Sequence, residues 1–159
     1  MLLPNAIVNR TDDIKAHHFT STDQSAEIGL RKYDFEIAAI EFVQKMGIRP
    51  NLMGYSFLIK AILLSLESPH LLRSFSKGLY PKIADHYGID VRAIERNIRM
   101  AIESAYDYDP ERVQSLFYYK VNKPCVSEVI SLAVESIRFG YRTSGFGEYG
   151  MADIRNFTE

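Results

Sequence analysis

The stretch that decides the fold runs from Leu79 to Tyr106 and has the sequence LYPKIADHYGIDVRAIERNIRMAIESAY. It predicts two helices joined by a tight turn. Pro81 suits the first position of a helix, because its missing N–H would be unpaired there in any case. Gly88 can adopt the positive φ that ends a helix. Asp90 is a predicted N-cap of the second helix, since its carboxylate can accept a hydrogen bond from a backbone N–H two or three residues on.

The second predicted helix, about 90–106, is amphipathic. At about 100° per residue its apolar side chains share one arc of about 100°. They are Val91, Ile94, Ile98, Ala101, Ile102 and Ala105. The charged side chains fall on the opposite side, namely Arg92, Glu95, Arg96, Arg99 and Glu103. Arg99 and Glu103 have the spacing of an ion pair. The helix should therefore pack along one face and expose a surface rich in guanidinium groups.

Two interpretations of this arginine row (Arg92, Arg96 and Arg99) are open. It can be an ordinary solvated face, as charged residues usually are. It can also be the recognition helix of a helix-turn-helix, which enters the major groove of DNA. A guanidinium donates two parallel hydrogen bonds to guanine, and a glutamate accepts one from the cytosine amino group. The spacing of Ala84, Gly88 and Ile94 matches a helix-turn-helix, which brings the two interpretations level.

The rest of the chain also predicts helices, so the expected fold class is all-α, a compact bundle of about six helices. The most apolar helix, Leu52–Leu66, is the expected centre of the core. Cys125 is expected to be a small buried filler. The other helices are predicted at Tyr33–Met46 with Asp34 as its cap, at Pro69–Phe75, at Pro110–Phe117 with Asp109 as its cap, and from a Ser127 cap to a stop at Gly140.

Length and composition predict one soluble globular domain. The chain has 159 residues, of which 47% are hydrophobic and 25% charged. Residues 1–33 are expected to form a partly disordered N-terminal extension that includes a loop at Asn9–Gln24. Residues 34–140 should form the helix-turn-helix effector domain, and 141–159 a flexible, glycine- and aromatic-containing tail. The net charge of −1 gives no general attraction to nucleic acid, so any DNA binding must use a local basic face.

The sequence also argues against several classes of protein. A single cysteine leaves no disulfide within the chain and suits a reducing cytoplasm. Met1–Val8 does not resemble a signal peptide, and no apolar run approaches the ~18 residues of a membrane span. His17 and His18 lack the further ligands of a metal site, so no metal or cofactor is expected. Asp85 and His86 are neighbours on a helix that point to different faces, which does not suit catalysis. The protein is predicted not to be an enzyme.

Beyond its spacing, Leu79–Tyr106 resembles the DNA-binding effector domain of the master sporulation response regulators of endospore-forming Firmicutes. The similarity continues through NLMGYSFLIKAI at Asn51–Ile62, LLRSFSKGLYP at Leu71–Pro81, and KPCVSEVISLAVESIR at Lys123–Arg138. It is nearly collinear from about Ala38 to Arg138, roughly two thirds of the chain. Fewer than forty residues precede it, so a phosphoacceptor receiver domain is not expected here.

The resemblance implies an all-α domain that binds a short element of double-stranded DNA, often as a head-to-tail pair. In the family the core of the recognition helix carries the base and phosphate contacts, and Glu95, Arg96 and Arg99 match its charged positions. Arg92 stands where the family has a small polar residue, and Met100 where it tends to have histidine, which could alter the preferred sequence.

The expected DNA-binding residues combine that match with exposed cations nearby. Arg96 is the expected guanine contact, Glu95 the contact to a partner base, and Arg99 a contact to phosphate or base. Arg92 is a further candidate, and the expected backbone contacts are Lys77, Lys82 and Lys120, with Lys123 beside the last. An alternative hypothesis is a protein-interaction module that pairs with a full-length sporulation regulator and titrates it without binding DNA. This alternative would be favoured if Asp85, Asp90 and Glu103 neutralised the arginine row and if Lys77, Lys82 and Lys120 formed no basic rim.

Overall fold

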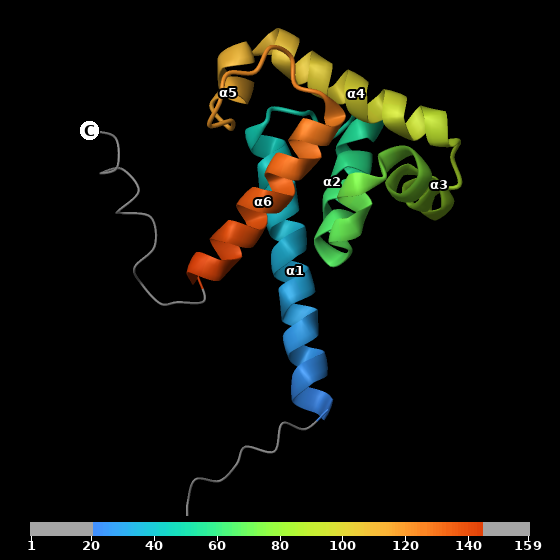
Figure 1. Ribbon diagram of the computed structural model, residues 1–159, viewed down its shortest axis with the longest axis vertical. Coiled ribbons are helices and arrows are strands. Elements are labelled where there is room, and N and C mark those ends of the chain that lie inside the picture. Colours follow the sequence, from blue (N-terminus) through green and yellow to red (C-terminus); the bar gives the residue numbers. More distant parts are fainter. Residues whose placement is uncertain (1–20, 145–159) are drawn as a thin grey trace, which may run out of the picture. The chain divides into compact units, whose positions relative to one another are not determined.

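The computed structural model describes residues 21–144, which form helices and no strand (Figure 1). The all-α prediction is confirmed. The predictions for residues 1–20 and for the tail at 145–159, including His17, His18 and the absence of a signal peptide, lie outside the described residues. The helices are α1 (Ser21–Lys45), α2 (Met53–Glu67), a 3₁₀ helix η1 (Pro69–Arg73), a π-helical turn η2 (Phe75–Leu79), α3 (Tyr80–Tyr87), α4 (Val91–Tyr108), α5 (Pro110–Gln114) and α6 (Val126–Ser144).

The chain divides within α1 into two units, Met1–Lys32 and Tyr33–Glu159. In the first, the described residues are helical from Ser21 onward. The prediction of a loop through Gln24 is therefore wrong for its last four residues, and Asp34 lies inside a helix instead of capping one. The reason is local: this stretch contains no proline, and its one glycine costs about 1 kcal/mol without breaking a helix. The rest of this description concerns the second unit.

Helix α2 lies at the centre of the core, as predicted. It contacts α3, α4, α6, η1 and η2, and its Phe57, Leu58 and Ile62 are fully buried. Helix α4 crosses the ends of α2 and α6 (Figure 1). Gly54 makes the crossing with α2 possible, because a Cβ at this position would collide with the Asn97 carbonyl oxygen and lie 2.7 Å from the Ala101 Cβ. The two helices thus approach backbone to backbone at this point.

The turn between α3 and α4 forms as its residues predict. Gly88 has φ 66°, and the Asp90 carboxylate accepts a hydrogen bond of 2.8 Å from the N–H of Arg92. The segment before α3 differs from the prediction. The expected helix through Phe75 is the shorter 3₁₀ helix η1, and the π-helical turn η2 then runs directly into α3. In that turn the N–H of Leu79 donates to the carbonyl of Ser74 at 3.0 Å, five residues back.

The last two helices also have different ends from those predicted. The Asp109 carboxylate caps α5 through the N–H of Arg112 at 3.0 Å, but α5 ends at Gln114 instead of reaching Phe117. Helix α6 begins at Val126, so Ser127 lies inside it. The N–H of Cys125 donates to the Glu128 carboxylate at 2.9 Å and closes the first turn instead.

Helix α6 also continues past its predicted stop. Among the described glycines only Gly47 and Gly88 have a positive φ, so Gly140 does not end the helix, which runs to Ser144. The prediction for the cysteine before this helix is also wrong. Cys125 is exposed, with its Sγ 3.1 Å from the Ser127 hydroxyl, and is not a buried filler.

One contact joins distant parts of the second unit and has no local signal in the sequence. Arg112 of α5 donates from Nε to the carbonyl of Lys45 at 2.8 Å and from Nη2 to the carbonyl of Gln44 at 3.0 Å. These carbonyls belong to the last turn of α1, where a helix leaves its oxygens without internal partners and favours a cation. The guanidinium therefore caps α1 from a position 67 residues further along the chain.

Candidate nucleic-acid interface

Helix α4 is fixed to the core by one face. The residues of its predicted apolar arc are buried, except Val91, which is half-buried; the buried ones are Ile94, Ile98, Ala101, Ile102 and Ala105. The three residues of the arginine row are exposed, and Glu95 and Glu103 are half-buried. Because the apolar arc packs on α2 and α6, the orientation of the charged face is set by the fold.

The ion pair within this charged face is not the predicted one. Arg99 donates from Nη1 to Oε1 of Glu95 at 2.8 Å, and Glu103 is not its partner. Both glutamates are four residues from Arg99, on either side of it. A glutamate on the N-terminal side of its cationic partner is the more favourable orientation along a helix, because it agrees with the helix dipole. Glu95 therefore holds the guanidinium of Arg99 against the helix.

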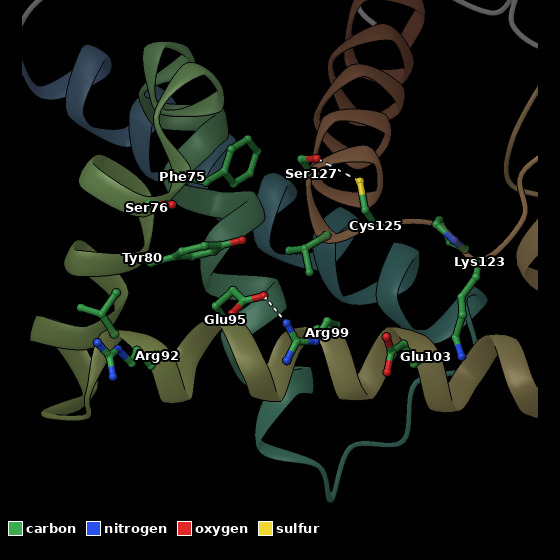
Figure 2. A pocket seen from close by; sticks show the side chains of 13 residues that line it. Phe75, Ser76, Tyr80, Arg92, Glu95, Arg99, Glu103, Lys123, Cys125 and Ser127 are labelled. Carbon is green, nitrogen blue, oxygen red and sulfur yellow. Dashed lines mark hydrogen bonds and ion pairs between the residues drawn. The ribbon is translucent and has the colours of Figure 1, made fainter.

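A groove of about 640 Å³ runs along one side of α4 (Figure 2). Its opposite walls are η2 with the start of α3, and the segment Lys123–Ser127 that leads into α6. The charged side chains in its lining are Arg92, Glu95, Arg99, Glu103 and Lys123. Lys123, whose backbone has φ 57°, places its Nζ 3.2 Å from the Asp107 carboxylate of α4.

Tyr80 places a buried phenol with a raised pKa in the groove. Its ring reaches from α3 across the groove beside Glu95 (Figure 2), and the residue is only 7% exposed. Burial, followed by the nearby Glu95 carboxylate and Cys125, raises the pKa of Tyr80 to about 12, while Arg99 acts in the opposite direction. The phenol therefore remains a neutral hydroxyl throughout the physiological pH range.

The arginine row contains both paired and unpaired guanidinium groups. Arg99 is paired with Glu95, whereas the guanidinium groups of Arg92 and Arg96 have no hydrogen bond or ion pair within the described part of the chain. Arg92 lines the groove, but Arg96 does not and stands on the outer crest of α4. Arg96 is therefore the cation of α4 that points away from the protein with its donors free.

The three lysines expected near the interface are exposed and lie on three different segments. Lys77 is on η2, Lys82 on α3, and Lys120 in the connection between α5 and α6. None of them lines the groove. The structure therefore brings together Arg92, Glu95 and Arg99 in the groove, and leaves the lysines on the surrounding surface.

Neither a metal centre nor a membrane span is found in residues 21–144. No three His, Cys, Asp or Glu side chains in this range come together as a metal ion would require. None of its helices combines the length and apolarity needed to cross a bilayer.

A known protein family matches most of the described part of the chain. The family model described as "Sporulation initiation factor Spo0A C terminal" matches residues 39–137, from the last turns of α1 to the middle of α6. The match includes the groove and every candidate DNA-binding residue named above. That family consists of DNA-binding domains of sporulation transcription factors and is not an enzyme family. With more than half of its length matched, the chain belongs to the Spo0A C-terminal family of sporulation initiation factors.

Proposed function

We propose that the protein is a sequence-specific transcriptional regulator whose helix-turn-helix, α3 and α4, places α4 in the major groove of DNA. The observation that carries this proposal is the exposed, unpaired guanidinium of Arg96 on a helix whose opposite face is buried. Gly88 and the Asp90 cap define where α4 begins. Since the orientation of α4 is set by packing, Arg96 is presented to a ligand and not to the protein itself.

The proposed roles follow from which donors are free. Arg96 makes the bidentate contact to a guanine, the commonest specific contact in the major groove. Glu95 accepts from a cytosine amino group, and Arg99 binds a phosphate or base once it leaves Glu95. Arg92, Lys77, Lys82 and Lys120 are proposed to neutralise phosphates, which position the protein without reading sequence.

The alternative, a protein-interaction module that titrates a sporulation regulator, needs a neutralised arginine row. Asp85, Asp90 and Glu103 make no ion pair with the row in the described residues, and Asp90 is engaged with a backbone N–H instead. Of the three arginines, only Arg99 has an ion-pair partner within residues 21–144, namely Glu95. The charge pattern thus favours DNA binding.

The test is a selection of bound duplexes from random DNA with the wild-type chain and with Arg96→Ala. We expect the variant to lose about 1–3 kcal/mol on the selected site and to relax its preference at one base pair. Arg49→Ala, which removes an exposed arginine outside the groove and α4, is the matched control and should bind as the wild type does. Equal binding of wild type and Arg96→Ala to every duplex would refute the assignment. Co-purification with a sporulation regulator, without binding to any duplex, would support the alternative.

A further inference from the structure

The outer crest of α4 carries one large apolar side chain beside the free guanidinium. Met100 is 58% exposed and does not line the groove beside α4. A single exposed methionine needs no explanation by itself, since much of any protein surface is apolar. Its position is what matters, because it follows Arg96 by four residues and therefore lies on the same face of the helix, one turn further along.

The spacing of the two side chains matches the spacing of base pairs. Four residues of α-helix advance about 6 Å along the axis. Stacked base pairs are about 3.4 Å apart. This rise equals about two base pairs if α4 runs parallel to the DNA axis, whereas a helix that enters the groove at an angle moves on by about one base every three or four residues. If Arg96 contacts a guanine, Met100 is therefore presented about one or two base pairs away. The apolar group that the major groove displays is the 5-methyl group of thymine, and the flexible, polarisable side chain of methionine adapts well to such a surface.

We propose that Met100 is a specificity-determining residue that packs against the methyl group of a thymine about one or two base pairs from the guanine bound by Arg96. This inference rests on the proposed function. Arg96 and Met100 then read one short segment with complementary chemistry, the arginine through hydrogen bonds and the methionine through apolar contact. The charged neighbours of Met100 on the same helix, Arg96 and Glu103, leave no wide apolar surface for a protein partner.

Replacing single thymines by deoxyuridine tests the proposal, because deoxyuridine lacks only the methyl group. Dissociation constants are measured for the selected duplex with each thymine replaced in turn, using wild type, Met100→Gln and Tyr108→Ala. For the wild type we expect a roughly fourfold loss at one thymine, the value of one buried methyl group. Met100→Gln, similar in length but polar, should bind the thymine and deoxyuridine duplexes equally. Tyr108→Ala removes another large exposed side chain of α4, 92% exposed against 58% for Met100, and should retain the fourfold difference.

The possible failures separate the two proposals. Arg96-dependent binding in which no thymine within three base pairs of the Arg96 guanine is sensitive to deoxyuridine would overturn the role of Met100 alone. A thymine sensitivity that persists in Met100→Gln would do the same. If the wild type prefers no duplex at all, the proposed function fails and the role of Met100 fails with it.

Discussion

Arg99 and Glu95 form a 2.8 Å ion pair on the wall of the groove, although their side chains are 49% and 39% exposed. An ion pair this accessible to water contributes only about 0–1 kcal/mol. It is therefore weak enough to open when a phosphate competes for the guanidinium. In the free protein, however, the charge of Arg99 is largely compensated.

Glu95→Gln should release Arg99 and increase non-sequence-specific DNA binding. The slope of log affinity against log salt should become more negative by up to about 0.9, the contribution of one further neutralised phosphate. The measurement is binding to an unrelated duplex at several salt concentrations. Glu67→Gln, at the exposed end of α2, changes the net charge equally and should leave the slope nearly as it is. Identical slopes for both variants would mean that Glu95 does not keep Arg99 from a phosphate.

Tyr80 should make folding stability depend on pH in the alkaline range. Its pKa is about 12 in the folded chain, raised foremost by burial, against about 10 when unfolded. The unfolded tyrosine thus ionises first, and the stabilisation, of order 2 kcal/mol, is complete below pH 10 and lost as the pH rises from 10 to 12. Urea unfolding of Tyr80→Phe between pH 9 and 11.5 should show a shallower decline than wild type. Tyr108→Phe, 92% exposed, should decline as the wild type does.

Gly54→Ala should destabilise the crossing of α2 and α4. The new Cβ would meet the Asn97 carbonyl oxygen, a backbone atom that cannot rotate away. Overpacking of this kind costs about 1–3 kcal/mol, which exceeds the gain from replacing a helical glycine. Unfolding in urea measures the difference. The same substitution at Gly140, where a Cβ meets nothing within 4 Å, should instead stabilise by about 0.5–1 kcal/mol.

Arg112→Ala should weaken the attachment of α5 to the end of α1. Both of its hydrogen bonds to the carbonyls of Gln44 and Lys45 would be lost, and we expect a decrease of about 1–3 kcal/mol in the free energy of unfolding. The free energy of unfolding of Arg112→Lys should lie between those of the wild type and Arg112→Ala, because an ammonium cannot reproduce the planar, forked donor arrangement of a guanidinium. Arg73→Ala, which removes an exposed arginine of η1, is the control. A loss no larger than that of the control would contradict the capping role.

The features that depend on neighbouring residues could be predicted from the sequence. The buried arc of α4, the Gly88 turn and the Asp90 cap each follow from a pattern spanning a few positions, and the structure confirms them. The apolar run of α2 likewise predicted the centre of the core. In the candidate site, the exposure of Arg96 followed directly from helical periodicity.

The features that depend on residues far apart in the chain could not be predicted from the sequence. Periodicity places both Glu95 and Glu103 beside Arg99 and does not choose between them. The groove requires Lys123–Ser127 to lie opposite α4, and the Arg112 cap joins residues 67 positions apart; neither leaves a local pattern. Helix ends were the weakest predictions, because Gly140 and Ser127 are compatible with a terminus without requiring one.

The π-helical turn at Phe75–Leu79 has a consequence for how the length of this chain can change. Its hydrogen bonds span five residues, so it holds one residue more than the corresponding α-helical turn. Losing one residue here would leave an ordinary α-helical turn at the start of α3, because Ser74 before it is already non-helical. A one-residue deletion inside α2 or α4 would instead rotate every following side chain by about 100°. Insertions and deletions among related chains should therefore collect at this turn, immediately before α3.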